Sequence, residues 1–141
     1  MNFSYFLENL EESLSYVDHA AQEIGYDNEE IKQLCKKSNQ IEIELDDFFK
    51  EHRDELGYMS VMPVSNGVYS VDRFGDIVYS IREFAKSEDI EITVYKGSIT
   101  DKDDIEKFRQ IIIKYSNLLD ELLNKIYEIG GEFNLDENEP Y

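Results

Sequence analysis

An apolar side chain recurs every three or four residues along three stretches of this chain, and this repeat constrains the fold more than any other feature. The longest stretch lies near the C-terminus and comprises Ile105, Phe108, Ile112, Tyr115, Leu119, Leu122, Ile126 and Ile129. Alternating spacings of three and four place these side chains on one face of an α-helix. With Thr100 and Asp103 as a capping pair and Gly130 after its end, the predicted helix has about 29 residues and a length of roughly 43 Å.

The first stretch predicts another long helix at the N-terminus. Its apolar positions are Phe3, Leu7, Leu10, Leu14, Val17, Ala21 and Ile24. We expect Gly25 to end this helix in the left-handed conformation, and Asp27 with Glu30 to begin the next helix. Because this connection is short, the second helix is expected to run antiparallel to the first.

The second stretch admits two interpretations. The positions of its helical register are Ile31, Leu34, Ser38, Ile41, Leu45, Phe48 and His52. Residues 40–45 also alternate between polar and apolar side chains, which is the period of a β-strand. A strand would divide the segment, whereas a continuous helix leaves Ile43 facing outward. The continuous helix is favoured because the register passes through residues 40–45 unchanged.

The chain between the second and third helices differs in character. Two β-prone runs flank Asn66-Gly67, a pair that is typical of a hairpin turn. A short apolar stripe then predicts a helix, and a final alternating run predicts a strand. The expected order is a strand at 61–64, a strand at 68–71, a helix at 74–85 and a strand at 90–95.

The expected fold class is therefore α+β, and mainly α. Three long amphipathic helices form an antiparallel bundle, and a small ββαβ insert at about residues 58–100 separates the second helix from the third. Residues 1–131 form a single domain, which is large enough to bury a core of its own. Residues 132–141 lack an apolar period and are expected to form a flexible acidic tail.

The charge of the chain limits its partners. The 141 residues include 32 aspartates and glutamates against 14 lysines and arginines, which gives a net charge of −18. Such a charge repels nucleic acids and anionic membranes and attracts basic proteins. We therefore expect a basic protein partner, such as a nuclease or another nucleic-acid-binding protein. We expect no direct contact with nucleic acid or with a membrane.

The acids are most dense in the second half of the second predicted helix, which Gly57 closes. This acidic surface comprises Glu42, Glu44, Asp46, Asp47, Glu51, Asp54 and Glu55. Like charges at this density oppose one another and weaken a helix. The run is either a solvated face or a surface that matches the nucleic-acid-binding groove of a partner, and the spacing is compatible with both interpretations.

Residues suited to catalysis or metal binding are few. Cys35 is the only cysteine, and the two histidines, His19 and His52, lie within predicted helices. The chain has no P-loop, no HExxH pair, no dinucleotide-binding glycine motif and no GxSxG motif. Residues 101–106 are rich in acids but lack the mid-loop glycine and distal glutamate of a calcium loop. We expect a protein that is not an enzyme, with no catalytic residue, metal or cofactor.

Three functions fit these features. The first is an acidic inhibitor that occludes a basic, nucleic-acid-handling partner, as bacterial immunity proteins and phage anti-defence proteins such as anti-CRISPR proteins do. The second is a coiled-coil-like adaptor or a homodimerisation module, in which apolar stripes pair with another chain. The third is a protein that sequesters a small ligand in its α/β insert. The polar and aromatic residues available for that ligand are Tyr58, Tyr69, Arg73, Tyr79, Arg82 and Tyr95.

The expected location is the cytoplasm. The N-terminus lacks the basic region of a signal peptide, because Met1 to Phe6 contains no lysine or arginine. The longest aliphatic run, Ile111 to Ile113, is far too short to cross a bilayer.

Overall fold

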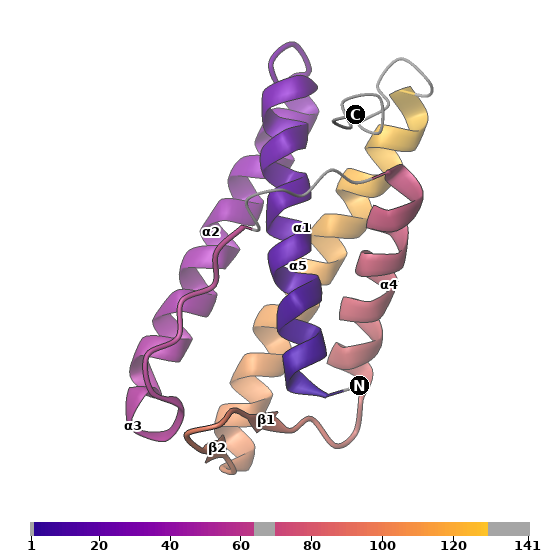
Figure 1. Ribbon diagram of the computed structural model, residues 1–141. Helices are drawn as coiled ribbons and strands as arrows, with labels where there is room; N and C mark the ends of the chain where they lie inside the picture. The colour runs from indigo at the N-terminus through magenta and orange to yellow at the C-terminus, as the bar shows by residue number, and fades with distance from the viewer. Residues whose placement is uncertain (1, 64–69, 130–141) are drawn as a thin grey trace, which may run out of the picture.

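The protein is mainly helical, as predicted. The computed structural model describes residues 2–63 and 70–129. Within these residues four long helices and one short helix form a packed bundle, and two very short strands precede the last helix (Figure 1). The elements are α1 (Phe3–Glu23), α2 (Glu29–Glu51), α3 (Arg53–Leu56), α4 (Val71–Lys86), β1 (Ile92–Thr93), β2 (Ser98–Ile99) and α5 (Lys102–Ile129).

The four long helices pack in a ring. Helix α1 contacts α2 and α4, and α5 contacts the same two helices from the other side. Helices α1 and α5 run in one direction and α2 and α4 run in the other (Figure 1). Each helix is therefore antiparallel to both of its neighbours, which confirms the expected orientation of α1 and α2. This order requires the chain after α3 to return along the bundle before α4 begins.

The apolar stripes of all four helices meet in one core. Six side chains of the predicted α5 stripe are fully or almost fully buried, from Phe108 to Ile126. Aromatic rings fill one end of the core, where Phe6 stacks on Phe84 with ring centroids 4.3 Å apart. Across the ring of helices, the hydroxyls of Ser13 and Tyr115 lie 2.8 Å apart and join α1 to α5. Burial of these stripes is the main favourable term in folding.

Helix α2 is continuous through residues 40–45, so the favoured interpretation is confirmed. Ile43 lies on the outer face of α2 and is 60% exposed. The helix starts differ from prediction by one residue. The side chain of Asn28, and not that of Asp27, caps α2 by accepting a hydrogen bond from the amide of Ile31. Asp101 takes the place predicted for Thr100 and accepts from the amides of Asp103 and Asp104.

The expectation of a left-handed Gly25 is wrong. Among the described residues, Gly57 is the glycine with positive φ, at 76°. At Gly25 the constraint is space, because a Cβ atom there would lie 2.9 Å from the carbonyl oxygen of Ala21 and 3.4 Å from the Cα of Lys32. The glycine therefore permits the close turn between α1 and α2.

The middle of the chain is not a separate ββαβ insert. Its helix, α4, has 16 residues and packs against α1 and α5 as a full member of the bundle. Residues 61–63 form no strand, and Val71 is the first residue of α4. The physical reason lies at Ser70, whose hydroxyl accepts from the amide of Arg73 and starts the helix there. Residues 64–69, with the predicted Asn66-Gly67 turn, lie outside the described residues.

The predicted strand at 90–95 is reduced to two residues. In β1, Ile92 pairs antiparallel with Ile99 of β2, and Thr93 pairs with Ser98. The hairpin lies at the end of the bundle where α2 ends and α5 begins (Figure 1). It packs closely on α3, because a Cβ atom on Gly97 would lie only 2.4 Å from the carbonyl oxygen of Glu55.

The predicted acidic tail at 132–141 lies outside the described residues. In the parts of the chain that are described, no helix is both long enough and apolar enough to cross a membrane.

Candidate functional site

A groove between α2 and α5 gathers part of the predicted acidic surface. Glu44, Asp47 and Glu51 line it from α2, at spacings of three and four residues that place them on one side of the helix. Asp103 and Glu106 line it from the first turns of α5. The groove is therefore bordered by five carboxylates from two helices that are distant in sequence.

The bottom of the groove is apolar. Phe48 is 4% exposed and belongs to the core, and Ile111 is half-buried beside it. Lys107 and Gln110 complete the lining from α5. Five carboxylates therefore stand against one lysine around a hydrophobic floor. A lysine or arginine side chain could contact this floor with its methylene groups and the carboxylates with its charged end.

A second lysine lies where this groove ends. Lys114 of α5 donates to both carboxylate oxygens of Glu44, at 2.7 and 2.8 Å. Both side chains are about half exposed, so the pair contributes at most about 1 kcal/mol to stability. The Lys114 charge offsets that of Glu44, and Glu106 bonds Arg109 of its own helix. Within the described part of the chain, Asp47, Glu51 and Asp103 form no ion pair across the groove.

The remaining predicted acids point elsewhere. Glu42 turns toward α1, where burial raises its pKa and the charges of Asp46 and Asp18 raise it further. Asp54 is exposed on α3. The predicted acidic surface is thus divided, because neighbouring acids on a helix point to opposite sides of its buried stripe.

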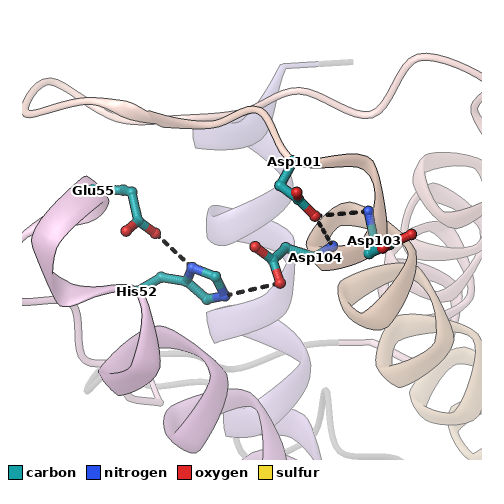
Figure 2. Close-up of polar contacts among 5 residues, drawn as sticks. All are labelled: His52, Glu55, Asp101, Asp103 and Asp104. Carbon is teal, nitrogen blue, oxygen red and sulfur yellow. Dashed lines mark hydrogen bonds and ion pairs between the residues drawn. The ribbon is translucent and has the colours of Figure 1, made fainter.

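Glu55 is engaged in a polar cluster around His52 (Figure 2). The Nδ1 atom of His52 lies 2.5 Å from the Glu55 carboxylate, and its Nε2 atom lies 3.9 Å from the carboxylate of Asp104. Figure 2 shows the imidazole ring between these two carboxylates, with Asp101 capping the first turn of α5 beyond them. His52 therefore links the end of α2 and α3 to the start of α5, which is a structural role.

Cys35 and Asp18 lie in a region where negative charge is disfavoured. Burial raises the pKa of the Cys35 thiol to about 11, and the charge of Asp18 also raises it. Burial likewise raises the pKa of Asp18, while His19 lowers it. The Cys35 thiol therefore stays protonated at neutral pH and is a poor nucleophile.

The residues predicted to bind a small ligand are dispersed. Arg73 pairs with Glu12 of α1, whereas Arg82 pairs with Asp120 of α5, so the two arginines hold α4 to different neighbours. Tyr79 donates to Glu83 on its own helix. Tyr58 lies under the guanidinium of Arg53, and Tyr95 is fully exposed on the hairpin. Tyr69 lies outside the described residues.

Asp103 and Glu106 were not among the predicted site residues. The sequence indicates correctly that these acids begin a helix. It does not indicate that this helix start lies beside α2. The available signal was their register, because they lie beside Ile111 on the flank of the α5 stripe. Among the described residues, no group of three or more histidine, cysteine, aspartate or glutamate side chains is placed to hold a metal ion.

No protein-family model, curated protein or solved structure matches this chain. What the groove can bind has to be derived from its own chemistry. Its carboxylates and apolar floor are suited to holding lysine and arginine side chains of another protein.

Proposed function

We propose that this protein is an acidic inhibitor that occludes the nucleic-acid-binding surface of a basic partner. The observation that carries the proposal is the groove between α2 and α5, with five carboxylates around an apolar floor. A protein surface that binds phosphates presents lysine and arginine side chains, and these side chains can bind carboxylates instead. Bacterial immunity proteins and phage anti-defence proteins such as anti-CRISPR proteins are the functional types that this proposal suggests.

The charge of the whole protein supports the same proposal. With a net charge of −18, the chain would attract a basic partner over a distance and speed up their encounter. Among the described residues, four lysine and arginine side chains, Arg73, Arg82, Lys114 and Lys125, form ion pairs between helices. Because these basic side chains are paired with acids of the same chain, they are not free to repel a basic partner. The acids in excess carry the net negative charge that would attract that partner.

The two other functions have less support. The adaptor hypothesis depended on apolar stripes that another chain would cover, and these stripes pack against one another within this chain. The ligand hypothesis depended on a polar-aromatic pocket, and its described residues lie in separate interactions. Neither function gains an observation of its own from the structure.

Capture followed by competition tests the proposal. The full chain is immobilised, and proteins of its source cell are retained at low salt and eluted near 0.5 M salt, where the screening length is about 4 Å. We expect an eluted basic protein that binds DNA or RNA, and we expect added nucleic acid to displace it from the immobilised chain. A retained partner that binds this protein and nucleic acid at the same time would contradict occlusion.

A further inference from the structure

We propose that charged residues at every seventh position of α2 and α5 set the register in which these two helices pair. This role is independent of what the acidic groove binds, because it concerns the assembly of the protein itself. It determines, however, which carboxylates meet in the groove. The residues that carry it lie along the seam where α2 and α5 contact each other.

Both helices carry a charged residue every seven positions on the flank that faces the other helix. On α2 these residues are Glu30, Lys37, Glu44 and Glu51. On α5, in the order in which an antiparallel helix passes them, they are Glu128, Glu121, Lys114 and Lys107. A spacing of seven keeps each set on one flank of its helix. The two sets therefore face each other as four pairs.

Two of these pairs lie in and beside the acidic groove. Lys114 donates to both carboxylate oxygens of Glu44 across the seam. Seven residues away on each helix, Glu51 and Lys107 line the groove from opposite sides. Their side chains are exposed and form no ion pair among the described residues. Exposed charges nevertheless attract each other without contact, up to a screening length of about 8 Å.

The other two pairs lie at a second groove, toward the opposite end of the seam. Lys37 and Glu121 line this groove from opposite sides. Glu30 and Glu128 form the last pair and are both acids, but Lys125 of α5 bonds both of them. At each of the four levels, an acid of one helix therefore faces a lysine of the other.

Other registers of the two helices oppose like charges. A slide of α5 by seven residues along α2 keeps the apolar stripes in phase, so burial separates these registers only at the helix ends. In one direction, Lys114 would face Lys37 and Glu121 would face Glu30. In the other direction, Glu121 would face Glu44. Charges beside the apolar stripe specify one register in coiled coils by the same means.

The register decides which acids line the groove. In the structure, Asp103 and Glu106 of α5 line the same groove as Asp47 and Glu51 of α2. A slide of seven residues corresponds to about 10 Å at 1.5 Å per residue. It would move Asp103 and Glu106 away from their present neighbours on α2. The lysines that favour the observed register therefore also assemble the acidic groove.

Four double variants test whether the pairs act level by level. In the two matched variants, Glu44→Lys with Lys114→Glu and Glu51→Lys with Lys107→Glu, both charges of one pair are exchanged. In the two crossed variants, Glu44→Lys with Lys107→Glu and Glu51→Lys with Lys114→Glu, both pairs are left with like charges. All four variants keep the net charge of the original protein. Both sets contain the same four substitutions, so the effect of each substitution on its own helix cancels.

Urea unfolding of the four variants measures the coupling. At low salt we expect the folding equilibrium constant of the matched variants to exceed that of the crossed variants roughly tenfold. The difference is expected to shrink toward zero in 1 M NaCl, where the screening length is about 3 Å. Crossed variants that fail to fold beside folded matched variants would be the same result in a stronger form. Equal stability of the two sets at low salt, a difference that persists in 1 M NaCl, or a matched variant that fails to fold would overturn the proposal.

Discussion

Glu42 is a residue whose charge opposes folding. Burial and the nearby charges of Asp46 and Asp18 raise its pKa in the folded protein. A carboxyl group with a raised folded-state pKa contributes stability while it is protonated, and this contribution is lost as the pH rises through that pKa. At neutral pH the ionised Glu42 therefore makes the fold less stable than an uncharged residue of the same shape would.

We expect Glu42→Gln to raise the free energy of unfolding at pH 7 and to lose this advantage as the pH falls below the pKa of an unfolded glutamate. Urea unfolding at pH 7 and at pH 4 measures the difference. The matched control is Glu8→Gln, at an exposed site on α1. A Glu42→Gln protein that is less stable than the original at pH 7 would refute this account of the site.

Cys35 is a second residue with a testable environment. Its side chain is 3% exposed, its Sγ atom lies 3.7 Å from the carbonyl oxygen of Val17, and its pKa is raised to about 11. We expect iodoacetamide at pH 8 to alkylate Cys35 far more slowly in the native protein than in urea, because the thiolate is rare and shielded. Equal rates in the two states would show that the thiol is open to solvent.

For single residues, the sequence predicts which side chains are buried better than it predicts which pKa values are shifted. Cys35 follows Leu34 on the apolar stripe of α2, so the helical register alone indicates that its side chain packs. The effect of Asp18 on Glu42 depends on how α1 and α2 are seated against each other, and no local pattern encodes that. The same limit explains the acidic surface, whose members were grouped by proximity in sequence although they point to different sides of α2.

Among the elements, two glycines provide opposite predictions. Gly75 lies inside α4, and a Cβ atom there would be no closer than 3.9 Å to Leu123 and Tyr127, which is ordinary contact. Gly75→Ala is expected to stabilise the protein by about 0.5–1 kcal/mol, because glycine is costly inside a helix. Gly97→Ala is expected to destabilise it by about 1–3 kcal/mol, because the hairpin must move away from the Glu55 carbonyl.

Thermal or urea unfolding of the two variants measures both effects in one experiment. The pair is a control for itself, since each protein gains the same methyl group. A loss of stability in Gly75→Ala would mean that α4 is not packed as described. An unchanged stability in Gly97→Ala would mean that the hairpin is not held against α3.

The helices were predictable to the extent that their own sequences determine them. The stripes of α1 and α5 are long enough to fix type and face. The starts of α2 and α5 lie one residue from the predicted ones, because Asp27 and Asn28, like Thr100 and Asp101, can both cap a helix. Helix α4 was assigned to an insert because β-prone residues precede it. Its place in the bundle depends on a core that the other three helices supply, and this is tertiary information.

For the whole molecule, the order of the helices around the core decides which surfaces exist. Helices α2 and α5 are neighbours, so Asp103 and Glu106 come beside Glu44, Asp47 and Glu51. The sequence predicted the excess of acid and an antiparallel bundle. It did not predict this pairing, because four amphipathic helices can be arranged around a core in more than one order. The groove is a property of the arrangement.

The most direct test of occlusion through the groove is the salt dependence of the affinity for the captured partner. Four neutral substitutions in the groove, Asp47→Asn, Glu51→Gln, Asp103→Asn and Glu106→Gln, are compared with four at exposed acids away from it, Asp72→Asn, Asp76→Asn, Glu88→Gln and Asp89→Asn. Both variants change the net charge equally. We predict that the groove variant binds more weakly and loses most of the salt dependence, whereas the control keeps nearly all of its affinity. Equal losses in the two variants would show that net charge, and not the groove, attracts the partner.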